Sequence, residues 1–151
     1  MATPDLQELS TQLDSPNSRD RLLALAALKD VDAADAVPLI RKVLDDESLQ
    51  VRGMAVFALG LKPTEECLEL LMGLLGDGDY SIRAAAAGAL GYLQDGRALE
   101  SLLQIFYEDT DWLVRFSAAV SLGNLQNPRA REALMSALEG DEVIMHQAAI
   151  A

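Results

Sequence analysis

The chain has 151 residues, of which 50% are hydrophobic but only 5% aromatic, so one domain with a continuous core of small aliphatic side chains is expected. Lys and Arg number 12 against 24 Asp and Glu, and the resulting formal charge of −12 disfavours nucleic acid and anionic membranes as partners. The single cysteine excludes an internal disulfide and favours a reducing, cytoplasmic location, and no run of 18 apolar residues is present to span a membrane.

Two alternating sets of helices are predicted in chain order. Apolar residues at helical spacing indicate A helices over residues 4–13, 34–44, 64–75, 97–107 and 128–138. Between them lie B helices that share one motif. Its arginine recurs at intervals of 31, 31 and 32 residues, as Arg21, Arg52, Arg83 and Arg115. Each repeat is therefore an A helix, a short turn and a B helix, and no strand pattern is found.

Each B helix carries a start signal and a stop signal. Four residues before the arginines, or at the same place in the last copy, stand Asn17, Ser48, Asp79, Asp111 and Asp141. Side chains of these types accept hydrogen bonds from the free N–H groups of a first helical turn. The stop signal is a glycine, which is predicted to adopt the left-handed conformation that ends a helix. These glycines are Gly60, Gly91 and Gly123.

The period predicts a single all-α domain over residues 1–151, a right-handed α-solenoid of about four and a half HEAT-like helix pairs with a period of about 31 residues. The repeats cover roughly residues 4–29, 34–60, 63–91, 95–123 and 127–151, and the last one is incomplete. Its final helix would leave Val143, Ile144 and Ile150 with little cover. We therefore expect either a truncated chain or end-to-end self-association through an uncapped C-terminus.

The motif resembles the phycobilisome-lyase-type family of HEAT-like repeats, whose pattern is D-x-x-x-V-R-x-x-A-A-x-A-L-G. The fourth copy matches it at Asp111, Val114, Arg115, Ala118, Ala119, Leu122 and Gly123, with Ser121 in place of one alanine. The resemblance implies a helical-repeat fold over almost the whole chain. It implies several functions, which include bilin lyase subunits, phycobilisome-breakdown factors, iron–sulfur assembly partners and plain scaffolds, and a fold alone does not choose among them.

The arginine row is predicted to be a structural ladder, with each guanidinium bridging acidic residues in neighbouring turns, because its planar fork suits carboxylates. The acidic residues expected to take part include Asp45, Asp46, Asp77 and Asp109. The alternative is that the row binds an anionic ligand.

No catalytic, metal or cofactor site is predicted. His146 is the only histidine and is followed by Gln147, which excludes the paired His-Glu ligands of a di-iron enzyme. Cys67 has acidic neighbours that oppose thiolate formation and is expected to be structural. The start of a calcium loop at Asp77 fails because its twelfth position is Gly88 rather than Glu.

The outward positions of the B helices carry almost no charge and predict a concave apolar groove that binds a partner. Phe57 and Phe116 flank a shallow centre, and Trp112 is the expected anchor. The alternative is a helical phase off by one position, with both phenylalanines packed between repeats. The predicted groove residues are Leu49, Phe57, Tyr80, Ala84, Gly88, Trp112, Phe116, Val120 and His146.

These observations predict a non-enzymatic scaffold that holds another protein, through a helix or a basic segment of that protein. The resemblance implies an alternative, one half of a bilin lyase or a phycobilisome-degradation-type factor. A bilin would then stack on Trp112, Tyr80 and Phe116, with its propionates near Arg83 and Arg115. A third possibility is an iron–sulfur assembly partner, although one cysteine and one histidine cannot hold a cluster alone.

Overall fold

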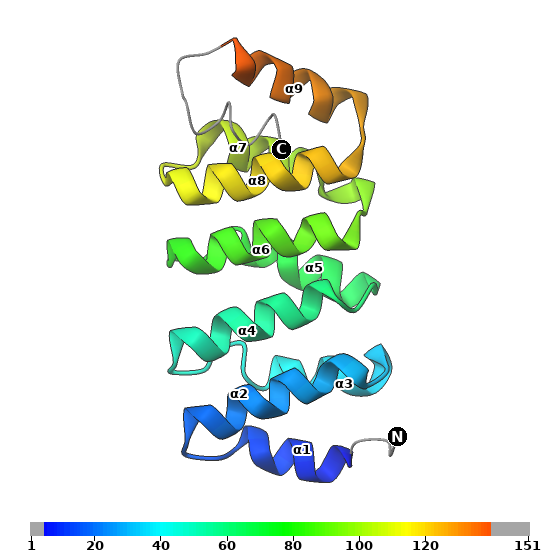
Figure 1. Cartoon of the computed structure of the whole chain (residues 1–151), viewed down its shortest axis with the longest axis vertical. Helices are drawn as coiled ribbons and strands as arrows, with labels where there is room; N and C mark the ends of the chain where they lie inside the picture. The colour runs from blue at the N-terminus through cyan, green and yellow to red at the C-terminus, as the bar shows by residue number, and fades with distance from the viewer. Residues whose placement is uncertain (1–4, 140–151) are drawn as a thin grey trace.

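A computed structural model describes residues 5–139, which form two layers of helices stacked along the long axis of the molecule (Figure 1). The A helices are α1 (Leu6–Leu13), α3 (Ala33–Arg41), α5 (Glu65–Leu74), α7 (Leu99–Glu108) and α9 (Pro128–Leu138). The B helices are α2 (Ser18–Ala27), α4 (Leu49–Gly60), α6 (Tyr80–Leu93) and α8 (Trp112–Leu125). Short 3-10 turns, η1 (Leu28–Asp30) and η2 (Gly96–Ala98), precede α3 and α7. The part of the chain that is described contains no strand, and the predicted all-α solenoid is confirmed.

Predictions about the last B helix and about the C-terminal end concern residues 140–151 and lie outside the described residues. They include the groove position of His146, the cap at Asp141 and the end-to-end association.

The predicted N-caps are confirmed at the start of all four described B helices. Asp111 Oδ1, for example, accepts hydrogen bonds from the backbone N–H groups of Leu113 (2.9 Å) and Val114 (3.4 Å). Asn17, Ser48 and Asp79 accept from the first turns of α2, α4 and α6 in the same way. Such caps fix where each B helix begins, because they satisfy N–H groups that have no partner within the helix.

The role predicted for the repeat glycines is wrong. Among the described residues no glycine has a positive φ, and the left-handed residues that end α6 and α8 are Gln94 and Gln126. The glycines lie within the helices and allow close approach: a Cβ on Gly60 would lie 2.8 Å from Ala89 Cβ, and one on Gly91 would lie 2.6 Å from Ser121 Oγ. The motif therefore specifies how tightly B helices pack rather than where they stop.

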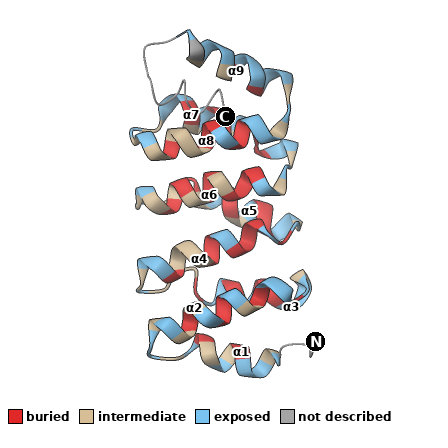
Figure 2. Cartoon of the chain, in the orientation of Figure 1, coloured by how far each residue is buried: buried red, intermediate tan, exposed pale blue. Residues whose placement is uncertain are grey.

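The core runs continuously between the two layers, and Figure 2 shows buried residues gathered where neighbouring helices meet. Leucine, valine, isoleucine and alanine side chains make up most of it, as the composition predicts. B helices contact the next B helix along the stack, most extensively from α4 to α6 and from α6 to α8. This continuous packing holds the outer face of the B helices in a fixed arrangement.

Candidate partner-binding face

The outer surface of α4, α6 and α8 is almost free of charge. Each of these helices contains one charged residue, the repeat arginine. The arginine of α6 binds the turn before that helix, and the arginine of α8 binds the last turn of α7. We call the exposed and half-buried surface of α2, α4, α6 and α8 the B-helix face; α2 adds the charges of Arg19 and Asp20 at its start, whereas the other three helices add none beyond their arginines. So little charge is unusual for one surface of a chain with a formal charge of −12. The charged residues are instead concentrated in the turns and on the A helices.

Large apolar side chains are exposed at the first residue of three successive B helices. They are Leu49 (42% exposed), Tyr80 (51%) and Trp112 (57%). Because they occupy one repeat position, they form a column along the edge of the B-helix face. Three of the predicted groove residues are therefore exposed on one surface. An interface anchor has to be accessible to its partner in this way.

The middle of the B-helix face is less uniform than the sequence predicts. Phe57 and Val120 are exposed, and a Cβ on Gly88 would meet nothing within 4 Å, so these three positions face outward as expected. Ala84 was expected to face outward too, but it is buried, because α6 is packed between α4 and α8. Phe116 is half-buried and packs against the core, so it is less exposed than Phe57.

Tyr92 is a part of this face that the sequence reasoning missed. It is 64% exposed near the end of α6, and its ring meets the ring of Phe57 edge-on, with centroids 6.0 Å apart and an interplanar angle of 85°. The repeat holds a signal for it, since Tyr92 and its counterpart Leu61 are large apolar residues that directly follow the repeat glycines. Leu61 is 41% exposed near the end of α4. The B-helix face therefore has a second aromatic cluster on α4 and α6.

The arginine row makes specific contacts in the turns between A and B helices. Arg83 Nε donates to Asp109 Oδ2 (3.0 Å) and its Nη1 donates to the main-chain oxygen of Asp77 (2.9 Å), so Asp77 contributes its backbone and not its carboxylate. Arg21 Nε lies 2.8 Å from Asp46 Oδ2, whereas the neighbouring Asp45 is exposed and does not pair with it.

The other two arginines of the row are Arg115 and Arg52. Arg115 Nε donates to the main-chain oxygen of Phe106 (2.9 Å). Arg52 makes no ion pair with any described residue, and its Nε is buried without a hydrogen-bond partner there. Hydrogen bonds from Ser81 lower the pKa of Asp79, and the charge of Arg52 adds to that effect. The predicted ladder is thus interrupted at α4.

A second set of ion pairs joins successive A helices, and no prediction anticipated it. The pairs are Lys42 with Asp14, Arg41 with Glu66, Arg97 with Glu65, and Arg129 with Glu100. Arg97 also binds Asp95, and this hydrogen bond lowers the pKa of Asp95 to about 2. Because these ion pairs neutralise cations of the A helices, the remaining acidic side chains give this surface its negative charge.

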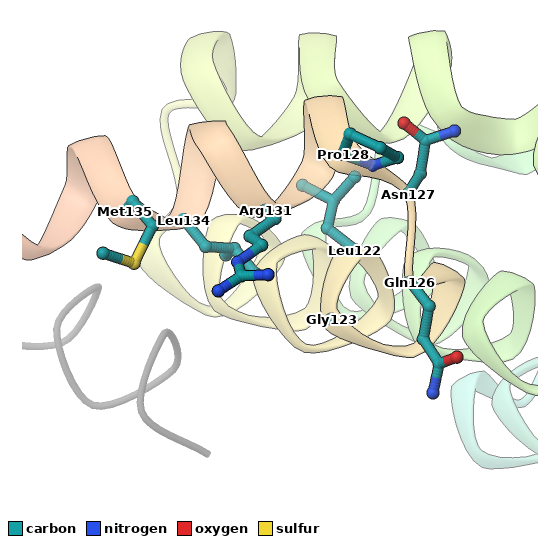
Figure 3. A pocket seen from close by; sticks show the side chains of 8 residues that line it. All are labelled: Leu122, Gly123, Gln126, Asn127, Pro128, Arg131, Leu134 and Met135. Atoms are coloured by element: carbon teal, nitrogen blue, oxygen red, sulfur yellow. The ribbon is translucent and has the colours of Figure 1, made fainter.

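A pocket of about 480 Å³ lies between α8 and α9, where Leu122, Leu134 and Met135 supply apolar lining and Arg131 stands at its edge (Figure 3). Gly123 also lines it. A Cβ on Gly123 would meet only Leu134 Cδ1, at 3.9 Å, so no helix among the described residues packs there as α6 packs on Gly60.

The remaining chemical groups lie away from this surface. Cys67 is fully buried, and its burial raises the pKa of the thiol more than the hydrogen bond with Thr64 lowers it. The described residues include no cluster of three or more potential metal ligands. Nor do they include a helix long and apolar enough to cross a membrane.

Stacked helix pairs with caps at equivalent positions and close glycine contacts define the class of helical-repeat solenoids. The family model for HEAT repeats matches residues 6–82, 42–122 and 68–151, so the chain belongs to the HEAT-repeat family.

Comparisons with solved structures agree with this assignment. A chain in the complex of CpcE and CpcF of phycocyanin lyase from Nostoc sp. PCC7120 superposes with a TM-score of 0.77 at 24% identity, covering 96% of this chain and 95% of that chain. An engineered protein superposes with a TM-score of 0.67 at 22% identity, covering 96% and 76%. None of the curated protein sequences compared with the chain matches it. The resemblance to the phycobilisome-lyase-type repeats is thereby confirmed at the level of the fold.

Proposed function

We propose that this protein is a non-enzymatic scaffold that holds a partner protein across the B-helix face. The observation that carries the proposal is the column of Leu49, Tyr80 and Trp112, exposed on helices whose only charged residues are the repeat arginines. Large apolar side chains gathered on one surface usually mark an interface, and Trp and Tyr are favoured anchors within it.

The charge distribution indicates the chemistry of the partner. Exposed carboxylates of Asp45 and Glu47 stand in the turn just before Leu49, next to the apolar column. A partner helix with an apolar stripe would cover the column, and basic residues beside that stripe would lie against the acidic turns. Because a cytoplasmic location was predicted from the cysteine content, we propose a cytoplasmic partner.

A matched pair of aromatic variants tests the proposal. Trp112→Ala removes an anchor from the B-helix face, whereas Tyr107→Ala removes a side chain of nearly equal exposure (58% against 57%) from the A helix α7. In quantitative pull-downs with both variants at equal concentration, a partner held by the B-helix face should bind Trp112→Ala about 30-fold more weakly, the effect of losing roughly 2 kcal/mol. Tyr107→Ala should bind like wild type. Equal losses, or a loss with Tyr107→Ala alone, would contradict the proposal.

A second candidate function is a subunit of a bilin lyase, favoured by the likeness to the phycocyanin lyase complex over nearly the full length of both chains. The contacts of Arg83 and Arg115 count against the predicted propionate partners, since both guanidinium groups already bind oxygen atoms. The pocket between α8 and α9 falls within the 300–1,000 Å³ typical of small-molecule sites and has Arg131 at its edge. A change in the visible spectrum of a free bilin on mixing, absent with Arg131→Gln, would favour this function over the scaffold.

A further inference from the structure

A smaller pocket, of about 210 Å³, opens between the C-terminal halves of α2 and α4 on the B-helix face. Its walls include Phe57 and Leu61, which are more than 40% exposed, and Leu25 lies buried in its floor. The full lining is Leu25, Ala26, Lys29, Met54, Phe57, Ala58, Leu61 and Lys62.

The repeat departs from its pattern at the junction where this pocket lies. Lys29 occupies the position held by Gly60 and Gly91 in the next two repeats, where the missing Cβ lets the following helix approach closely. At this junction α2 has already ended at Ala27, and α2 and α4 contact each other less extensively than later pairs of B helices. This junction therefore lacks the close glycine contact of the later pairs, and the exposed Lys29 stands in the place of that glycine.

The lining carries positive charge and no acidic residue, although the whole chain has twice as many acids as bases. Lys29 is exposed at the rim. Lys62 is only 7% exposed, and its Nζ donates to the main-chain oxygens of Lys29 (3.0 Å) and Val31 (2.5 Å). An ammonium group has three protons to donate, so Lys62 retains one after these two bonds. The pocket thus combines an apolar interior with two cations.

We propose that this pocket binds the C-terminal residue of the partner protein, as a leucine-type side chain beside a free carboxylate. The inference rests on the proposed scaffold function and names a specific point of contact within it. The volume falls below the range of small-molecule sites and suits one side chain. The side chain fills the space beside Phe57 and Met54, and the carboxylate binds Lys29 at the rim, with the free proton of Lys62 beneath.

Small probes of the same chemistry test this without the partner. N-acetyl-leucine, titrated to tens of millimolar into the full chain, should shift the NMR signals of the Met54 methyl group and the Phe57 ring. N-acetyl-leucinamide, which lacks the carboxylate, should bind about fivefold more weakly, and N-acetylglycine, which lacks the side chain, should cause no shift. Absence of shifts at Met54 and Phe57, or equal binding of the amide, would overturn the proposal. Tighter binding of octanoate would also overturn it, since the occupant would then be a fatty acid.

Variants of the lining separate charge from space. Lys29→Gln keeps the length of the side chain and should abolish the preference for N-acetyl-leucine over its amide, while Arg19→Gln, at another exposed cation of α2, should leave it intact. Ala26→Leu fills the pocket from its exposed rim and should remove binding of both probes. Trp112→Ala should not affect the probes. Failure of the probes with partner binding still dependent on Trp112 would refute this inference and leave the scaffold function standing.

Discussion

The close contact of α6 with α8 at Gly91 predicts that a larger residue there destabilises the protein. Gly88, three residues earlier on the same helix, offers a control. A Cβ on Gly91 would lie 2.6 Å from Ser121 Oγ and 3.0 Å from its Cα and Cβ, whereas a Cβ on Gly88 would meet nothing within 4 Å. Ser121 cannot easily turn aside, since its hydroxyl donates to the main-chain oxygen of Ala87 at 2.5 Å. Gly91→Ala must therefore push α6 and α8 apart.

The two substitutions should change stability in opposite directions. Alanine improves the intrinsic helix propensity at either site by about 1 kcal/mol. At Gly91 the overpacking costs about 1–3 kcal/mol, and strain on the buried hydrogen bond of Ser121 adds about 1 kcal/mol. We expect Gly91→Ala to lower the free energy of unfolding by about 1–3 kcal/mol and Gly88→Ala to raise it by up to about 1 kcal/mol.

Urea denaturation followed by circular dichroism measures both differences. Thermal melts should separate the two variants by about 2–16 °C, at about 2–4 °C per kcal/mol. If Gly91→Ala proved as stable as Gly88→Ala, the repeat glycines would not be needed for close packing. The pocket between α2 and α4 would then not depend on the absence of a glycine at position 29.

Three further predictions concern charge and burial. Replacing Arg83 by Met should destabilise the protein by about 2–4 kcal/mol, because the buried carboxylate of Asp109 loses its partner. Arg52→Met breaks no ion pair among the described residues and should change stability by less than about 0.5 kcal/mol in the same denaturation assay. The hydrogen bond with Arg97 lowers the pKa of Asp95 to about 2 in the fold, so its stabilising effect is present above the unfolded pKa of about 3.9 and is lost as the pH falls toward 2. Asp95→Asn retains the cap and should make the fall of stability with decreasing pH shallower. An unchanged acid dependence would exclude this role. Cys67 should react with a thiol reagent only in denaturant, and rapid labelling of the native protein would contradict its burial.

The sequence was sufficient for the fold because the repeat combines local signals that agree with one another. Cap residues such as Asp79 and Asp111 act on the N–H groups of the next two or three residues, so their effect does not depend on distant parts of the chain. The spacing of the arginines gave the length of each helix pair, and the B helices of the structure follow that register.

Predictions that depended on the neighbouring repeat were less accurate. The reading of Gly60 and Gly91 as helix stops was wrong because both a stop and a close contact favour glycine, and only the position of the next helix distinguishes them. The burial of Ala84 and the missing ion pair at Arg52 have the same origin. Each depends on interhelical distances that vary from one junction to the next.

The sequence by itself determined the class of fold, the helix starts and the nearly uncharged character of α4, α6 and α8, since these follow from residue type and period along one chain. Tertiary structure alone decided which apolar side chains remain exposed, how the arginines pair, and that the junction at Lys29 is open. The physical reason is that exposure and pairing depend on the separation of packed helices, and a difference of about 1 Å in that separation decides whether a side chain fits.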